Sequence, residues 1–187
     1  MPISVRRVKI TDLNEMQQTN LSCLAENYHM WYWLYHYLIY PASSHCAVDS
    51  SNHILGYVLS KMDDDSRRKN PNEPLHALMT SVAVYNGYRK LGLAKQLMLS
   101  SQRENQLCYK AEYVLLHVRE TNRAGHLLYE NALGYVKNQV CKEYYVDGED
   151  AWSMKLVLPK TEAQLAEEAA KKAANSQPRK PKKGGRR

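Results

Sequence analysis

A short basic segment with one glycine lies near the middle of the chain. It follows an apolar run typical of a strand (Met79–Val84) and precedes a run typical of a helix (Ala94–Tyr109). The free N–H groups at a helix start carry partial positive charge and bind phosphate or pyrophosphate, and a glycine lets the backbone approach the anion. Taken alone, the segment is better interpreted as an ordinary strand–helix turn. It comprises Arg89, Lys90, Leu91, Gly92, Leu93 and Ala94.

Three other side chains could move or orient a proton, although each also has a simpler interpretation. Glu26 follows a helix-like run and could be a solvated carboxylate. Tyr145 lies in a run typical of a late strand and could be a packed aromatic. Arg119 follows a short buried strand and could form a salt bridge to Glu26 or Glu149. A salt bridge and a functional role are compatible, because a bound arginine orients a carboxylate.

Four segments of the chain together resemble the GCN5-related N-acetyltransferases, and more narrowly the family of NatA N-terminal acetyltransferase catalytic subunits. The basic segment fits that superfamily's acetyl-CoA loop, Gln/Arg-x-x-Gly-x-Gly/Ala, with Arg89, Gly92 and Ala94 at its defined positions. The resemblance runs from about Pro2 to Leu158. The other three segments are Leu24–Tyr28, Leu116–Arg119 with Asn122–Ala124, and Tyr144–Ala151.

The resemblance implies that acetyl-CoA is the co-substrate and that two parts of the chain hold it. The backbone of Val82, Ala83 and Val84 would pair with the pantetheine arm like an added strand. The N–H of Val82 or Val84 would also polarise the thioester carbonyl, as in an oxyanion hole. The N–H groups from Leu91 to Ala94 would face the pyrophosphate.

The resemblance also implies roles in handling the amine. A peptide α-amine has a pKa of about 7.7 to 8.0, so one weak base can suffice to deprotonate it. Glu26 would assist deprotonation or place the substrate, Tyr145 would hold the amine end, and Arg119 would support both. The segments that match the family also contain Leu24, Tyr28 and Tyr144, which would contact the substrate.

The departing thiolate needs a proton donor. Asn122 and Tyr129 are seven residues apart, which is two helical turns, so they share one helix face. In the wider superfamily this pair contacts the pantetheine, and the tyrosine donates a proton to the sulfur. A helical tyrosine is otherwise usually a core residue. No cysteine has a base at a matching position, so we expect direct attack in a ternary complex rather than a covalent enzyme intermediate.

Two positions depart from the residues that this family usually has. Ala25 stands where relatives often have Pro, which makes the segment before Glu26 less rigid. Leu78 stands where a His commonly precedes the pair Thr80–Ser81, and this weakens the case for a His in the base.

The elements that must position these residues follow from hydrophobic periodicity and turn signals. The predicted strands are Ile3–Ile10, His45–Asp49, Ile54–Met62, Leu75–Val84, Tyr113–Val118, Tyr135–Tyr145 and Ala151–Leu158. The predicted helices run from Thr11–Asp12 to Leu24, from Tyr28 to Tyr40, from Ala94 to Tyr109, and from Thr121 or Asn122 to Leu133. The charged segment Asp63–Pro74 is predicted to be a surface loop. This order predicts an α/β fold with a mixed, mainly antiparallel sheet flanked by helices.

The net charge of +7 resides almost entirely at the C-terminal end of the chain. Residues 159–187 contribute +6 and residues 1–158 only +1, so the body lacks the basic face of a DNA-binding domain. We therefore expect an acetyltransferase domain over 1–158 and a basic tail over 159–187. The tail is predicted to be helical over Thr161–Ala174 and disordered from Ser176. It is interpreted as solubilising, or as a contact for ribosomal RNA or a nuclear import receptor.

The chain's bulk features suggest a cytoplasmic protein. It has no apolar run long enough for a membrane span and no secretory signal near Met1–Lys9. Its four cysteines lack metal-ligand spacing, so we expect no metal and buried, reduced thiols. These are Cys23, Cys46, Cys108 and Cys141.

The sequence thus predicts a peptide α-N-acetyltransferase. The resemblance implies small first residues (Ser, Ala, Thr, Gly, Cys, Val), a large helical-repeat auxiliary subunit and, through it, the ribosome and nascent chains. The aromatic helix Tyr28–Tyr40 is the expected contact surface. One rival is a lysine or small-amine acetyltransferase of the same fold, which would need a stronger base because an ε-amine has a pKa of about 10.4. The other rival is a non-catalytic acyl-CoA-binding scaffold.

Overall fold

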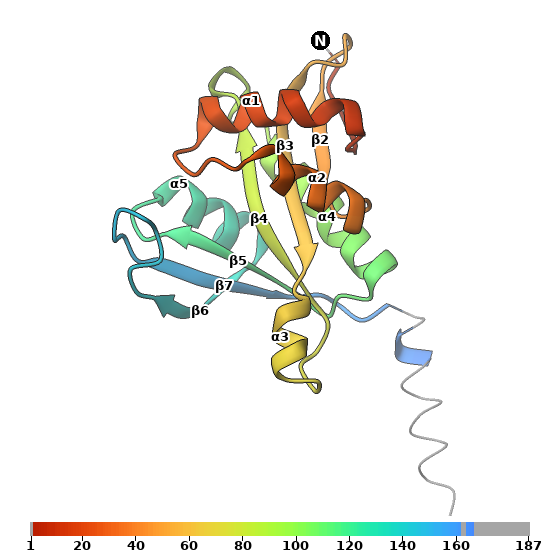
Figure 1. Cartoon of the computed structure of the whole chain (residues 1–187), viewed down its shortest axis with the longest axis vertical. Coiled ribbons are helices and arrows are strands. Elements are labelled where there is room, and N and C mark those ends of the chain that lie inside the picture. The colour runs from red at the N-terminus through yellow and green to blue at the C-terminus, as the bar shows by residue number, and fades with distance from the viewer. Residues whose placement is uncertain (1, 162–163, 167–187) are drawn as a thin grey trace, which may run out of the picture.

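The computed structural model of the chain describes residues 2–161 and 164–166 (Figure 1). Within this part of the chain the strands are β1 (Ser4–Arg7), β2 (His45–Val48), β3 (Ile54–Met62), β4 (His76–Val84), β5 (Tyr113–Arg119), β6 (Val136–Cys141) and β7 (Ala151–Val157). The α-helices are α1 (Leu13–Cys23), α2 (Met30–Ile39), α3 (Asp64–Lys69), α4 (Leu93–Tyr109) and α5 (Arg123–His126). No helix among the described residues is both long enough and apolar enough to span a bilayer.

The strands form one sheet in the order β1-β2-β3-β4-β5-β7-β6. All neighbouring pairs are antiparallel except β4 and β5, which are parallel. This confirms the predicted mixed, mainly antiparallel sheet. The parallel pair is joined only where His76–Met79 meets Tyr113–Leu116. Beyond these residues β4 and β5 diverge, which Figure 1 shows clearly.

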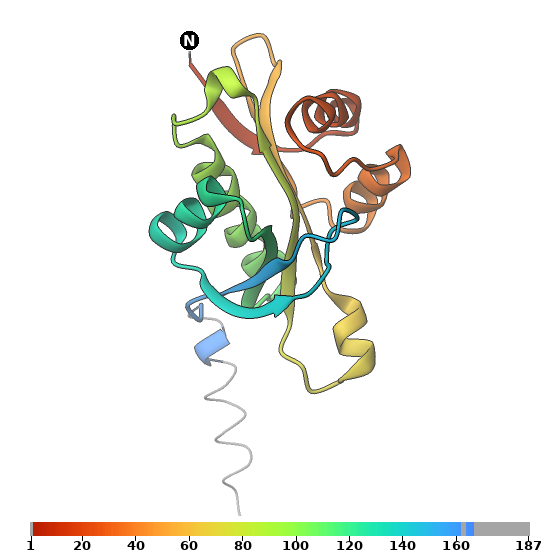
Figure 2. The same ribbon diagram turned by 90° about the vertical axis from the view of Figure 1, so that its left-hand side faces the viewer.

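Two helical layers cover the two faces of the sheet (Figure 2). Helices α1 and α2 pack on one face, around a core that includes Met16, Trp33 and Tyr57. Helix α4 packs on the other face, where Leu97 and Met98 meet the apolar side of the central strands. Both layers therefore cross β3 and β4, so the diverging end of β4 is fixed from both sides.

Helix α2 is anchored to β4 by a buried histidine. His36 is fully buried, and its Nδ1 lies 2.8 Å from the Tyr32 carbonyl oxygen. Its Nε2 lies 3.2 Å from the Thr80 hydroxyl. Thr80 is the extra residue of a β-bulge, because Leu59 pairs with Ser81 while the next pair joins residues 60 and 79. The contact therefore fixes α2 against the irregular point of β4.

Several predicted elements differ in extent or kind. The segment predicted as a loop over Asp63–Pro74 contains α3, because the Asp63 side chain accepts the Ser66 N–H at 3.3 Å and caps the helix. The first strand ends at Arg7, before a 3-10 turn. The predicted helix after Thr121 has the expected extent, but after α5 it continues as a π-helical turn, Leu127–Ala132.

Other predictions were wrong about single residues. Strand β6 ends at Cys141, so Tyr145 lies in the β6–β7 loop and not at the end of a strand. Of the cysteines only Cys46 is fully buried, whereas Cys108 is exposed. Of the tail predicted to be helical, residues 164–166 are helical, and residues 167–187 lie outside the described part of the chain.

Candidate active site

A cavity of about 200 Å³ lies where β4 and β5 diverge, and we call it the central cavity. It is walled by the α1–α2 loop, α2, β4, β5, the start of α5 and the β6–β7 loop. All four predicted catalytic residues and all three predicted substrate contacts line it. The predicted residues at the central cavity are Leu24, Glu26, Tyr28, Val82, Arg119, Asn122, Tyr129, Tyr144 and Tyr145.

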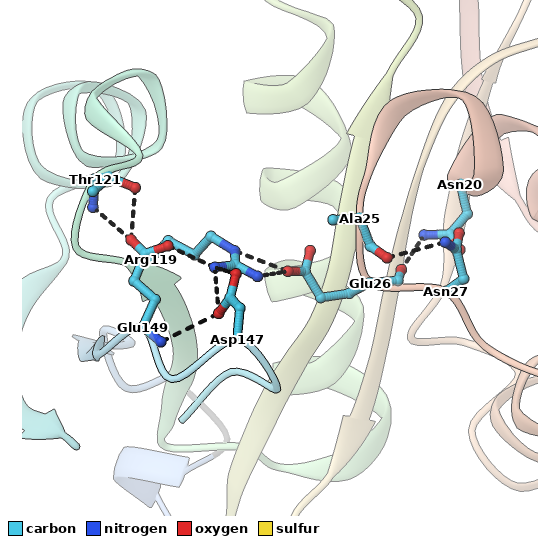
Figure 3. A network of polar contacts seen from close by, with 8 residues as sticks. All are labelled: Asn20, Ala25, Glu26, Asn27, Arg119, Thr121, Asp147 and Glu149. Atoms are coloured by element: carbon cyan, nitrogen blue, oxygen red, sulfur yellow. Dashed lines mark hydrogen bonds and ion pairs between the residues drawn. The ribbon is translucent and has the colours of Figure 1, made fainter. Parts of the chain in front are cut away.

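Arg119 connects the two loops that flank this cavity (Figure 3). On one side its Nε and Nη2 donate to Oε1 of Glu26 at 2.9 and 2.6 Å. On the other side Nη1 donates to Oδ2 of Asp147 at 2.8 Å and to Oε2 of Glu149 at 2.6 Å. These contacts confirm the predicted salt bridges to Glu26 and Glu149. Both bonds to Glu26 use Oε1, and Figure 3 shows its other carboxylate oxygen without a partner among the residues drawn.

The three carboxylates around the Arg119 guanidinium shift pKa values in this cluster. The hydrogen bond that Arg119 donates to Glu149 raises the pKa of Arg119 further above its ordinary value, so it stays charged. Thr121 donates its hydroxyl at 2.6 Å and its N–H at 3.0 Å to Glu149. These bonds, together with Arg119, lower the pKa of Glu149 to about 2. The Arg119–Glu149 pair is therefore fully charged at neutral pH.

The loop that carries Glu26 is held by side chains of the helices on either side of it. Asn20 of α1 donates to the Glu26 carbonyl oxygen at 3.0 Å, and Gln17 donates to the Tyr28 carbonyl oxygen at 3.0 Å. Trp33 of α2 donates its indole N–H to the same carbonyl at 3.3 Å. These three hydrogen bonds restrain the backbone of the loop on both sides of Glu26.

Aromatic rings form the opposite wall. Tyr144 stacks on His117 of β5, with ring centroids 4.5 Å apart and planes at 14°. The guanidinium carbon of Arg119 lies 3.9 Å from the centre of the Tyr145 ring, a cation–π contact. Burial raises the pKa of Tyr145 and lowers that of His117. At neutral pH both groups are uncharged, so Tyr145 can donate or accept a hydrogen bond.

Asn122 and Tyr129 meet at the same cavity, although the helix between them is not a regular α-helix. Asn122 caps α5, because its Oδ1 accepts the Gly125 N–H at 2.9 Å. Tyr129 lies in the π-helical turn, and burial raises the pKa of its phenol to about 12. The predicted pairing of these two residues therefore holds in space, and Tyr129 keeps its proton at neutral pH.

A second cavity, of about 320 Å³, lies at the start of α4, and we call it the helix-start cavity. Gly92 is the N-cap of α4 in a left-handed conformation (φ 78°), and no atom lies within 4 Å of where its Cβ would be. The first N–H groups of the helix have no acceptor within the helix. Arg89 is tied to the end of β4, because its Nε donates to the Val84 carbonyl oxygen at 3.0 Å. The cavity has a mainly apolar lining, and Arg89, Lys90 and Lys95 add positive charge beside helical N–H groups of the kind that bind phosphate.

Most of the predicted coenzyme segment lines the helix-start cavity. Two predicted residues line neither cavity: Ala83 is buried in the core beneath α1 and α2, and the Leu91 side chain is exposed. For both residues the predicted contact with the coenzyme is made by the backbone, so the position of the side chain does not bear on it. The predicted residues at the helix-start cavity are Val84, Arg89, Lys90, Gly92, Leu93 and Ala94.

Sequence reasoning missed several residues at the central cavity. His117 could have been predicted, because residues i and i+2 of a strand share a face and Arg119 was already a candidate site residue. Tyr32 and Thr80 are brought there by long-range packing of α2 on β4, which has no local signal. Asp147 belongs to the Arg119 cluster because of how the β6–β7 loop folds.

The comparisons with known proteins agree with this geometry. The family model described as "Acetyltransferase (GNAT) family" matches residues 10–135. The "N-terminal acetyltransferase A complex catalytic subunit NAA10" of Arabidopsis thaliana is 48% identical over 153 residues, which cover 82% of this chain and 77% of that protein. The corresponding subunit, ard1, of Schizosaccharomyces pombe is 40% identical over 181 residues, covering 93% and 100%. The solved structure of Chaetomium thermophilum Naa20 with a bisubstrate analogue superposes with a TM-score of 0.72 at 30% identity, covering 83% of this chain and 86% of that one.

The fold and the site define an acetyltransferase of the GNAT class. The chain belongs to this family and, within it, to the catalytic subunits of the NatA-type N-terminal acetyltransferases. It is therefore an enzyme that uses acetyl-CoA as its co-substrate.

Proposed function

We propose that this enzyme acetylates the α-amine of polypeptides with small first residues and that its chemistry takes place in the central cavity. The observation that carries the proposal is the position of Glu26. Its carboxylate is held by Arg119 at the point where β4 and β5 diverge, and one oxygen remains for a substrate. An α-amine has a pKa of about 7.7 to 8.0, so a single oriented carboxylate is a sufficient acceptor for its proton.

The chain's own residues divide the work. Glu26 accepts the proton of the amine, directly or through one water, and the Tyr145 hydroxyl holds the same nitrogen in line. Arg119 positions both groups, through its salt bridge to Glu26 and its contact with the Tyr145 ring. Leu24, Tyr28 and Tyr144 surround the first side chain and limit its size.

Tyr129 serves the departing sulfur. Burial raises the pKa of Tyr129 to about 12, so its phenol is protonated at neutral pH. It can therefore hydrogen-bond to the sulfur and give it a proton as the C–S bond breaks. Asn122 fixes the start of the same helix beside it.

Acetyl-CoA supplies the activated acetyl group. The N–H groups from Leu91 to Ala94, with Arg89 and Lys90, hold its pyrophosphate at the helix-start cavity. The backbone of Val82, Ala83 and Val84 holds the pantetheine arm, because this edge of β4 is not paired with β5. An N–H of Val82 or Val84 faces the thioester carbonyl.

We also propose an auxiliary subunit, a large helical-repeat protein that brings the enzyme to nascent chains at the cytoplasmic ribosome. The relatives from Arabidopsis and fission yeast are named as catalytic subunits of a complex. The outer side of α2 exposes Trp31, Leu38 and Ile39, with Trp31 78% exposed. Such a contiguous apolar stripe is typical of a protein interface.

The function is tested with acetyl-CoA and a panel of synthetic peptides, with and without the copurified partner. We expect acetylation of peptides that begin with Ser or Ala and none of the same peptides with a blocked N-terminus and an internal Lys. Acetylation of the internal Lys would favour the lysine acetyltransferase. Binding of acetyl-CoA with no turnover of any amine, even with the partner, would favour the scaffold.

A further inference from the structure

A third cavity opens on the same face of the sheet as the substrate side of the central cavity, and we call it the side cavity. It has a volume of about 450 Å³ and is lined by residues of α3 and of the strands, including His76, Tyr113, Leu115 and Lys155. Figure 2 places α3 on the same side of the sheet as α2. The function proposed above does not use this cavity.

The central and side cavities meet at one pair of residues. Leu78 lines the central cavity, Leu115 lines the side cavity, and the two are direct partners across β4 and β5. Direct partners in a sheet point to the same face. Both leucines are partly exposed, so they form an apolar floor between the two cavities.

A lysine lies at each end of this floor. Lys61 of β3 pairs with Leu78, and Lys155 of β7 pairs with Leu115, so the four side chains form one row across a single face. Lys61 lies 5.9 Å from the centre of the Tyr35 ring of α2. Lys155 lies 3.7 Å from the centre of the Tyr113 ring.

Neither lysine has a carboxylate partner among the described residues. The carboxylates nearby are engaged with other groups. Asp63 lies 3.2 Å from His76 Nε2, and Glu73 accepts the Tyr113 hydroxyl at 2.6 Å. A lysine placed against an aromatic ring at the rim of a groove keeps its charge available to an incoming anion.

The length of this groove matches a few residues of extended polypeptide. Along β5, Leu115 is two residues and Tyr113 four residues from His117 of the central cavity. At about 3.3 Å per residue, these steps are about 7 and 13 Å. An extended substrate with its first residue in the central cavity would place its third residue over the leucine floor and its fifth residue beside Tyr113.

Resting on the proposed function, we propose that the substrate polypeptide leaves the active site over Leu78 and Leu115, and that Lys61 and Lys155 select acidic side chains at about its third to fifth positions. The preferred substrate class is therefore a polypeptide with a small first residue and an acidic segment close behind it. Both lysines are partly exposed, so each contributes a preference rather than an absolute requirement.

The test uses eight-residue peptides with the same first two residues and Glu, Gln or Lys at positions three to five. For the wild-type enzyme we expect kcat/KM to fall in the order Glu, Gln, Lys, by about threefold per lysine contact. The difference should arise mainly in KM and should shrink at about 1 M salt, where the Debye length is about 3 Å.

Charge-reversal variants test whether Lys61 and Lys155 cause the preference for acidic peptides. We expect Lys155→Glu and Lys61→Glu each to reduce or invert the preference, and Lys155→Arg to retain it. Lys137→Glu is the matched control, because Lys137 pairs with the core residue Met154 and so faces the opposite side of the same hairpin. That control should keep the wild-type order.

A two-residue peptide with an amidated C-terminus, which ends before the floor and carries no carboxylate, separates this proposal from the proposed function. Every variant should acetylate it at the wild-type rate, which also shows that the variants are folded. If the wild type acetylates the short peptide but treats the Glu, Gln and Lys peptides alike, the groove proposal is wrong and the proposed function stands. A preference for Glu that persists in both reversal variants also overturns the groove proposal. No acetylation of the short peptide would overturn the proposed function itself.

Discussion

At the residue scale, one arginine organises the active site. Arg119 faces three carboxylates and the ring of Tyr145, so the cluster has an excess of negative charge beside the position proposed for the amine. A negative field stabilises an ammonium group as it arrives. The arginine keeps each carboxylate in one orientation, so the substrate's nitrogen meets a fixed acceptor.

Replacing Glu26 tests its role as that acceptor. Glu26→Gln keeps the size of the side chain and removes its charge, so we expect kcat to fall by about 100-fold for a Ser-starting peptide. Acetyl-CoA affinity should not change, because Glu26 lies outside the helix-start cavity. Steady-state kinetics and calorimetric titration with acetyl-CoA measure the two quantities.

Glu26→Asp supplies the comparison, since it keeps a carboxylate that is one methylene shorter. It should recover part of the lost turnover. Wild-type kcat in Glu26→Gln would show that the residue only holds Arg119.

The residues of this site differ in how far sequence could predict them. The salt bridge between Arg119 and Glu26 was foreseen as one alternative, because both residues lie in recognisable segments and carry opposite charges. Tyr145 was predicted at this site, but at the end of a strand. The apolar residues Tyr144–Val146 favoured a strand there, but pairing with β7 stops at Cys141, and the loop instead folds toward Arg119.

At the element scale, the start of α4 is the feature that sequence predicted best. A glycine between a strand and a helix specified the turn, and the structure has Gly92 there at φ 78°. Helix α3 shows the opposite case. Its acidic N-terminal turn after Asp63 is a helix signal, but the charges and prolines around it favoured a loop.

A bulky residue at the start of α4 should block the coenzyme. Gly92→Trp would fill the open space beside the first helical N–H groups, so we expect the Kd for acetyl-CoA to rise by at least about 100-fold. The left-handed backbone also makes the substitution cost about 1–2 kcal/mol of folding free energy. Calorimetric titration and thermal unfolding measure the two effects.

Gly134→Trp is the matched control, because Gly134 has φ 77° and is equally open, and it lies outside both cavities. It should lower the melting temperature by a similar amount and leave acetyl-CoA binding unchanged. Equal losses of binding in both variants would mean that strain, and not the filled space, is responsible.

At the scale of the whole molecule, a buried histidine connects stability to pH. Burial lowers the pKa of His36 from about 6.5 to about 4. Between these values the unfolded chain binds a proton that the folded chain does not, so the free energy of unfolding falls as the pH drops through this window. The full effect is on the order of 3 kcal/mol.

His36→Leu should flatten this dependence. We expect the variant to be less stable than the wild type at pH 7.5, because it loses the contacts to Thr80 and Tyr32. The difference should shrink or reverse toward pH 4. His45 and His117, whose pKa values burial also lowers, remain in both proteins and cancel in the comparison.

Urea unfolding at pH 7.5, 5.5 and 4 measures the difference. Parallel stability curves for the two proteins would rule out His36 as a source of the pH dependence. Local sequence could not predict this contact, because the two residues it joins are 44 positions apart and a bulge turns Thr80 toward α2.

The divergence of β4 and β5 determines the routes by which the two substrates can bind and be released. The opening between them has walls from both sides of the sheet, with Tyr32 on the α2 side and Tyr129 beyond α5. With the binding positions proposed above, the nucleotide end of the coenzyme and the body of the substrate protein would lie on opposite sides of this opening. Spent coenzyme could then leave while the acetylated chain is still bound, and only the first few residues of the substrate would have to enter.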